Sequence, residues 1–131
     1  TDARGLARLA SRLARANTAL EVMTDGAERY LASINGAASG SFDLAAFAAL
    51  SDEIRVRLLI RAIDRAGHEG PAELGKVEAL LQAMDRATAG KKPGRGVQLK
   101  QTLAGALISI QNQRIHIGPA PRRGRRMAGL P

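Results

Sequence analysis

The stretch Ala89–Thr102, "AGKKPGRGVQLKQT", separates two kinds of sequence pattern. It holds three glycines, one proline and four basic residues. Before it, apolar residues recur every three or four positions, which is the period of a helix. After it, they recur at every second position, which is the period of a strand. The change of period predicts an α+β fold, mainly α, in which four helices precede a small antiparallel sheet.

The same change of pattern divides the chain into four parts. We expect a helical subdomain over residues 1–89, a basic hinge over 90–96 and a β-meander over 97–118 packed on the helices. Residues 119–131 are rich in proline and arginine and show no periodicity, so we expect a flexible basic tail there. The start of the chain lacks an initiator Met, and we expect the sequence to have been cut from a longer parent.

One long helix is predicted over about residues 3–34. Its apolar positions alternate spacings of three and four, which makes a single narrow stripe like the seam of a coiled coil or a bundle. At about 1.5 Å per residue this helix would be roughly 48 Å long. The stripe consists of Leu6, Leu9, Leu13, Ala16, Leu20, Met23, Ala27, Tyr30 and Ile34.

Three further helices are predicted over residues 44–50, 52–66 and about 72–88. Asp43 and Ser51 precede the first two as N-caps, because their side-chain oxygens can accept from free backbone N–H groups.

The ends of the last two helices carry their own signals. Gly67 ends the helix over 52–66, and Pro71 suits the first turn of the next one. Four arginines are expected to face away from the apolar side of the helix over 52–66, namely Arg55, Arg57, Arg61 and Arg65.

Three strands are predicted after the hinge. The segments "VQLKQT" (97–102), "ALISIQ" (106–111) and "RIHIG" (114–118) each alternate apolar and polar residues. The short segments "LAG" and "NQ" between them are candidates for tight turns, which gives an antiparallel meander.

Charge is distributed unevenly along the chain. The net charge is +8, and Asp85 is the last acidic residue. Residues 1–85 hold ten basic and twelve acidic side chains, a net of −2, whereas residues 86–131 hold ten basic and no acidic ones, a net of +10. Such a segment indicates a polyanionic partner, and we favour nucleic acid over the alternative of a solubilising tail.

The basic side chains of the second half are the candidate binding residues. Lys100 and Arg114 occupy polar strand positions and could share one face with Gln98, Gln113 and His116. Aromatic side chains for base stacking are absent there, so contact with the backbone and shape of a folded RNA is expected. The candidates are Lys91, Lys92, Arg95, Lys100, Arg114, Arg122 and Arg123.

Other kinds of site find little support. The chain has no cysteine and two histidines, His68 and His116, which we expect to be a solvated turn residue and an exposed strand residue. No catalytic pair or metal site can be assigned from spacing. The glycines of the 89–102 stretch match no nucleotide-binding loop. No apolar run is long enough for a membrane span.

The order of four segments resembles a known family. They are "LARLASRLARANTALEVM", "FDLAAFAALSDEIRVRLLIRAIDRAG", "VEALLQAM" and "RGVQLKQTLAGALISIQNQRIHIGPAP". Together they resemble the region that follows the ATP-pyrophosphatase domain in tRNA(Ile)-lysidine synthetases, over about residues 3–121. That family joins lysine to the wobble cytidine of an isoleucine tRNA through an adenylated intermediate.

The resemblance implies a cytoplasmic, tRNA-binding portion of a ligase, separated from its catalytic domain. The family's SGG-x-DS loop is absent, since the one "SG", at Ser39 and Gly40, is followed by Ser41 and Phe42. ATP and Mg²⁺ would therefore belong to the missing N-terminal domain, and this chain would bind isoleucine tRNA without catalysing a reaction or binding a cofactor. Two alternatives stay open: a helical interaction module, with the long helix as a homo-oligomer surface, and a DNA-binding architectural protein.

Overall fold

The computed structural model describes residues 2–35, 40–89, 96 and 98–122. Within them, helices and strands follow in the order expected for an α+β fold that is mainly helical. The expected hinge and most of the expected tail lie outside the described residues. The elements are α1 (Ala3–Asn35), β1 (Ser41–Asp43), α2 (Leu44–Ala48), α3 (Asp52–Ala66), α4 (Leu74–Thr88), β2 (Leu99–Leu103), β3 (Ala106–Gln111) and β4 (Arg114–Pro119).

The predicted helices are confirmed, and their ends follow local hydrogen bonding. The carboxylate of Asp43 accepts from the backbone N–H of Ala46 at 2.9 Å and caps α2 as expected. Ser51 is the N-cap residue of α3, although its side chain makes no capping hydrogen bond to any described residue.

The predicted start of α4 was wrong. The N-cap is Glu73, so Pro71 lies before the helix and not in its first turn. The backbone N–H of Ala72 donates to Asp64 Oδ1 at 2.9 Å, which ties this part of the loop to α3. The chain therefore becomes helical only from Leu74 onward.

The sheet has four strands where three were predicted. β1 pairs antiparallel with β4, with Phe42 opposite Ile115, and the strand order is β1-β4-β3-β2. Phe42 is buried, and the backbone N–H of Leu44 donates to the carbonyl of Gln113 at 2.9 Å, which continues the pairing past β1. A three-residue strand is too short to show an alternating pattern, so this strand could not be recognised from the sequence.

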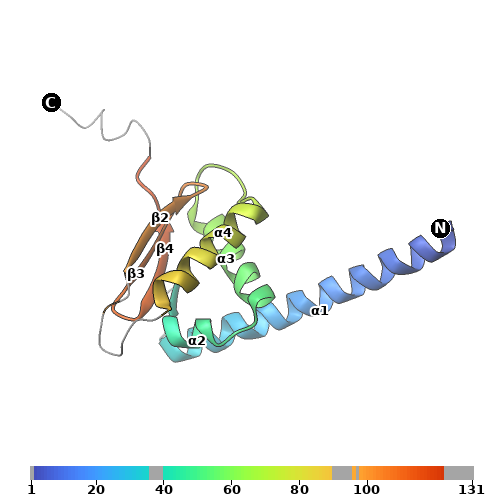
Figure 1. Cartoon of the computed structure of the whole chain (residues 1–131), viewed down its shortest axis with the longest axis horizontal. Helices are drawn as coiled ribbons and strands as arrows, with labels where there is room; N and C mark the ends of the chain where they lie inside the picture. Colours follow the sequence, from blue (N-terminus) through green and yellow to red (C-terminus); the bar gives the residue numbers. More distant parts are fainter. Residues whose placement is uncertain (1, 36–39, 90–95, 97, 123–131) are drawn as a thin grey trace.

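The core lies between one face of this sheet and the helices (Figure 1). Ile108 and Ile110 on β3 and Ile115 on β4 are fully buried, as the period of two predicts. They belong to one continuous apolar cluster with residues of α2, α3 and α4. The residues of α3 in this cluster are Ile54, Val56, Leu58, Leu59, Ala62 and Ile63.

Only the second half of α1 joins this core, through a stripe that differs from the predicted one. Thr24 and Leu31 are fully buried, whereas Met23, Tyr30 and Ile34 are exposed. The predicted stripe repeats every 3.5 residues, and in a straight helix of 3.6 residues per turn such a stripe drifts by about 20° per heptad. Leu20 and Ala27 of the predicted stripe still pack against the core, whereas the drift has carried Met23, Tyr30 and Ile34 off the core side.

The turn between β2 and β3 is held against the loop between α3 and α4. The carbonyl of Ala104 accepts from the backbone N–H of Glu69, and His68 Nε2 lies 2.9 Å from the carbonyl of Ala120. His68 is therefore half-buried and bonded, not the solvated turn residue that was predicted. Gly105 has φ +82°, and a Cβ built on it would lie 2.6 Å from the backbone N of His68.

Replacing Gly105 with alanine is expected to lower the free energy of unfolding by about 1–3 kcal/mol, because the positive φ and the close backbone approach both penalise a Cβ. Gly75→Ala is the matched control, since no other described residue lies within 4 Å of its Cβ position. It should raise stability by about 0.5–1 kcal/mol through helix propensity. Denaturant unfolding followed by circular dichroism measures both, and equal effects would contradict the packing described.

Arg55 was predicted to face away from the apolar side of its helix, and this was wrong, because its side chain is buried. Its guanidinium donates to Asp85 Oδ1 on α4 at 2.8 Å and to Asp52 Oδ1 at 2.6 Å. The same group lies over the ring of Phe47 on α2, 5.9 Å from its centroid. One arginine thus links α2, α3 and α4, and these contacts raise its pKa, chiefly through the bond to Asp85.

Arg55→Ala is expected to lower the free energy of unfolding by about 2–3 kcal/mol, because hydrogen bonds to charged groups contribute about 1.5–3 kcal/mol each and the two carboxylates can partly return to water. The comparison is Lys76→Ala, which removes an exposed pair with Glu73 and should cost less than about 0.5 kcal/mol. Chemical denaturation of the two variants measures the difference. Similar losses of unfolding free energy would contradict the predicted contribution of the Arg55 hydrogen bonds.

Candidate nucleic-acid interface

One side of the sheet is turned away from the helices (Figure 1). Lys100 on β2 is paired with Ser109 on β3, Ser109 with His116 on β4, and His116 with Ser41 on β1. Directly opposed residues in an antiparallel sheet lie on the same face. These four side chains therefore form a row across all four strands, in which Lys100 and His116 are exposed. We call this side of the sheet the outer face.

Arg114 lies two residues from His116 on β4 and so shares the outer face. It is half-buried, and its Nη2 donates to Ser41 Oγ at 3.1 Å. Gln111, its partner on β3, is exposed on the same face and was not singled out from the sequence.

The expected sharing of one face by Lys100, Arg114 and His116 is thus confirmed, while their binding role stays a prediction. Gln113 does not lie on the strand with them. It occupies the turn between β3 and β4 with φ +65°. Gln98 is exposed and precedes β2.

The remaining candidates lie toward the ends of the sheet region. Arg122 is exposed, three residues after the end of β4. Lys91, Lys92, Arg95 and Arg123 lie outside the described residues. The binding role of the basic stretch 89–102 therefore stays a prediction. The described part of the candidate surface consists of Lys100, Arg114 and Arg122.

An open groove runs between α4 and the edge strand β2. Lys76 and Arg86 of α4 and Gln101 of β2 line it, together with the acidic residue Glu69. Sequence reasoning missed this groove, because it depends on how α4 packs beside β2. The one available signal was that Arg86 opens the acid-free part of the chain.

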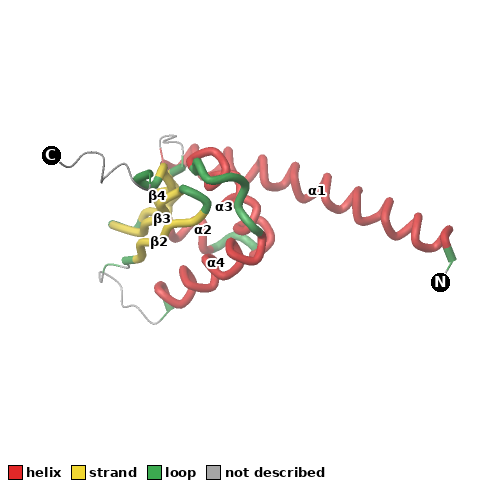
Figure 2. Tube along the Cα trace, turned by 90° about the horizontal axis from the view of Figure 1, so that it is seen from above, coloured by secondary structure: helices red, strands yellow, loops and turns green. Residues whose placement is uncertain are grey.

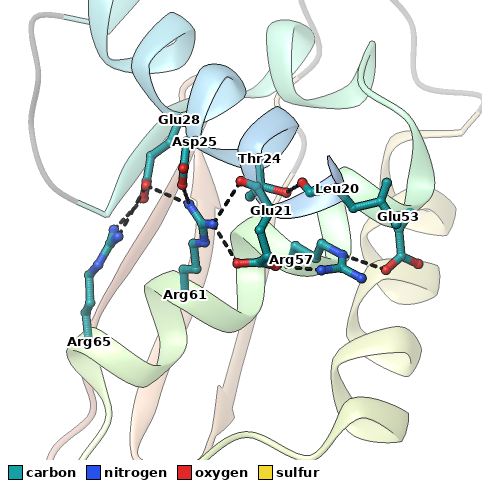
Figure 3. Close-up of polar contacts among 9 residues, drawn as sticks. All are labelled: Leu20, Glu21, Thr24, Asp25, Glu28, Glu53, Arg57, Arg61 and Arg65. Atoms are coloured by element: carbon teal, nitrogen blue, oxygen red, sulfur yellow. Dashed lines mark hydrogen bonds and ion pairs between the residues drawn. The ribbon is translucent and has the colours of Figure 1, made fainter. Parts of the chain in front are cut away.

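Arg57, Arg61 and Arg65 of α3 have acidic partners on α1 (Figure 3). Arg61 donates to Glu21 Oε1 and contacts Asp25 Oδ1, both at 2.8 Å. We call the set the α1–α3 ion-pair cluster. Its members are Glu21, Asp25, Glu28, Arg57, Arg61 and Arg65.

Sequence reasoning placed these arginines away from the apolar side of α3 but did not assign their partners. A usable signal was present: acids recur at helical spacing in residues 21–28, and arginines recur at helical spacing in residues 57–65. The cluster fixes the direction of α1 relative to α3. It also satisfies the positive charges of α3 within the protein.

These contacts shift carboxyl pKa values. The hydrogen bond from Arg65 holds the pKa of Glu28 below its ordinary value of 4.5, against the opposing effect of burial. Hydrogen bonds from Arg61 and then Arg57 lower the pKa of Glu21 in the same way. A carboxyl whose pKa is lower in the folded state stabilises the fold above its unfolded pKa, and this contribution is lost as the pH falls through the folded value.

The free energy of unfolding is therefore expected to fall as the pH drops through 4.5 and below, in part because Glu28 and Glu21 become protonated. Glu28→Gln should make this dependence shallower, since the amide does not titrate. Glu78→Gln, at an exposed position on α4, is the matched control and should leave the slope unchanged. Urea unfolding between pH 3 and pH 7 measures the slopes, and identical slopes for the two variants would contradict the role of Glu28.

No family model and no solved structure matches this chain. Curated relatives do. A protein of Bradyrhizobium diazoefficiens is 56% identical over 95% of the chain, and one of Rhodopseudomonas palustris is 54% identical over 95%. A Methylobacterium protein is 37% identical over 92% of the chain. All three are named tRNA(Ile)-lysidine synthase.

The homologues of this chain are tRNA(Ile)-lysidine synthases. The resemblance inferred from the sequence is confirmed. The chain spans 38% of the length of the Bradyrhizobium diazoefficiens tRNA(Ile)-lysidine synthase and matches the C-terminal region of these relatives. In the part of the chain that the structure describes, no three His, Asp or Glu side chains are placed to share a metal ion, and no helix is long and apolar enough to cross a membrane.

Proposed function

We propose that this chain is the tRNA-binding segment of a tRNA(Ile)-lysidine synthase and that the outer face of its sheet contacts the tRNA backbone. The observation that carries the proposal is the position of Lys100 and Arg114 on an open sheet face, within a third of the chain that has no acidic residue. The names of the relatives support tRNA as the polyanion.

The side chains of the outer face suit phosphate and ribose better than bases. Lysine and arginine contact phosphates, and a serine hydroxyl or an imidazole can bond to 2′-hydroxyls or phosphate oxygens. Lys100, Ser109 and His116 provide these groups in one row. Phe42 on β1 is buried in the core, and the outer face of the described strands carries no Phe, Tyr or Trp on which bases could stack. The expected mode is therefore recognition of a folded backbone.

The chemical step would belong to the part of the relatives that this chain does not span. In the proposed enzyme, that part uses ATP, with Mg²⁺, to activate the wobble cytidine of an isoleucine tRNA before lysine is attached. The role of the present segment is to bind the tRNA and orient it in the cytoplasm. It supplies positive charge and a rigid sheet, and no residue of it is proposed to act on the reacting atoms.

Binding of an isoleucine tRNA transcript to the chain is expected to weaken as salt rises, because phosphate contacts release counterions. Lys100→Gln should weaken binding about 3–10-fold and reduce the slope of log affinity against log salt by about one. Arg114→Gln should act in the same direction. Fluorescence anisotropy at two or more salt concentrations measures both quantities, with thermal unfolding to confirm that each variant is folded.

Arg8→Gln is the charge-matched control, because Arg8 belongs to the first turns of α1. The N-terminal end of this helix lies far from the sheet (Figure 1). Equal losses from Lys100→Gln and Arg8→Gln would mean diffuse charge attraction and would contradict the proposed surface. Tighter binding to duplex DNA than to the tRNA would favour the architectural DNA-binding alternative. A combined Lys91→Ala, Lys92→Ala and Arg95→Ala variant tests the contribution of the basic stretch.

A further inference from the structure

The first half of α1 extends away from the rest of the molecule (Figures 1 and 2). Residues 3–19 are exposed, apart from Gly5, which is partly covered. At about 1.5 Å per residue this segment is about 25 Å long. It carries three large apolar residues, Leu6, Leu9 and Leu13, and each is more than half exposed, at 54%, 53% and 61%.

The second half of the same helix shows which direction faces the core. Thr24 and Leu31 are fully buried there, and Leu20 and Ala27 pack against the core cluster. Because an α-helix has 3.6 residues per turn, positions 18 residues apart lie five whole turns apart and point in the same direction. The buried face can therefore be extended along the axis into the exposed half.

The exposed leucines continue the buried face. Leu6 lies 18 residues before Thr24, Leu9 lies 18 before Ala27, and Leu13 lies 18 before Leu31. All three leucines thus point in the direction that is buried further along the helix. Isolated exposed leucines need no explanation, but three that extend an existing packing face form an incomplete interface. We call Leu6, Leu9 and Leu13 the leucine face.

The opposite side of the same segment is basic. With about 100° of rotation per residue, Arg4, Arg8 and Arg15 lie roughly opposite Leu6. Residues 3–19 contain no acidic residue. The segment is therefore amphipathic in its own right, with its apolar side on the same side as the folded core.

We propose that the leucine face is the docking site for the polypeptide that precedes this region in the full-length synthase. The chain corresponds to the C-terminal region of its relatives and spans 38% of the first of them, so most of a relative's length lies on the N-terminal side of α1. Because that polypeptide is covalently attached just before α1, its effective concentration at the leucine face is high.

A second copy of the chain is a poorer occupant. Pairing of residues 3–19 with the same segment of another copy would bring two sets of four arginines together. Residues 3–19 offer no carboxylate to pair with them. This inference shares with the proposed function the relation to the longer relatives, but it requires no contact with RNA.

The test compares solvent access to the leucine face in the 131-residue chain and in the full-length protein that contains it. The chain has no cysteine, so single Leu9→Cys and Leu13→Cys variants provide defined thiols, and Arg8→Cys is the matched control on the opposite side. The rate of alkylation by iodoacetamide is measured at these sites by peptide mass spectrometry, without RNA.

Both leucine-face thiols are expected to react at least about tenfold more slowly in the full-length protein than in the 131-residue chain, and the Arg8→Cys thiol should react at similar rates in both. Equal rates at Leu9→Cys and Leu13→Cys in the two proteins would overturn the proposal. So would protection that appears in the 131-residue chain alone as its concentration rises, because this would identify a second copy as the occupant. If the leucine-face thiols are protected from alkylation in the full-length protein but the protein does not bind tRNA, only the proposed function is refuted.

Discussion

The structure depends on the burial of α3 among the other elements. Its apolar side supplies Leu58, Leu59 and Ile63 to the core behind the sheet, all fully buried. Arg55 bonds to α4 through Asp85, and Arg61 bonds to α1 through Glu21. Almost every turn of this 15-residue helix therefore contacts another element, and the positions of α1, α4 and the sheet are set by their contacts with α3.

The division of charge has a structural counterpart. The arginines of α3 are paired with acidic residues of the helical half, as in the α1–α3 ion-pair cluster. The acid-free third supplies three of the four strands, and their outer face carries Lys100, Arg114 and His116. β1 comes from the helical half and places Asp43 opposite Arg114. The arginines that tie α3 to α1 and α4 and the basic residues of the outer face thus lie on different elements.

Much of the fold followed from local patterns. The extent of α1, the Asp43 cap and the alternation in β3 and β4 each depend on residues close in sequence, so they could be predicted without knowledge of the tertiary structure. Lys100 and His116 were assigned to one sheet face for the same reason. Two of the predictions that were wrong involve partners far along the chain: β1 pairs with a strand more than 70 residues later, and Arg55 reaches Asp85.

The sequence by itself determined the α+β class, the helix and strand periods, the separation of charge and the family resemblance, because each is a property of neighbouring residues or of composition. Only the tertiary structure decided that β1 completes the sheet, that Thr24 and not Met23 faces the core, and that Leu6, Leu9 and Leu13 are uncovered. The reason is that a helix or strand pattern specifies which residues share a face. Which faces are buried depends on the lengths of the elements that pack against them, and here α3 is less than half as long as α1.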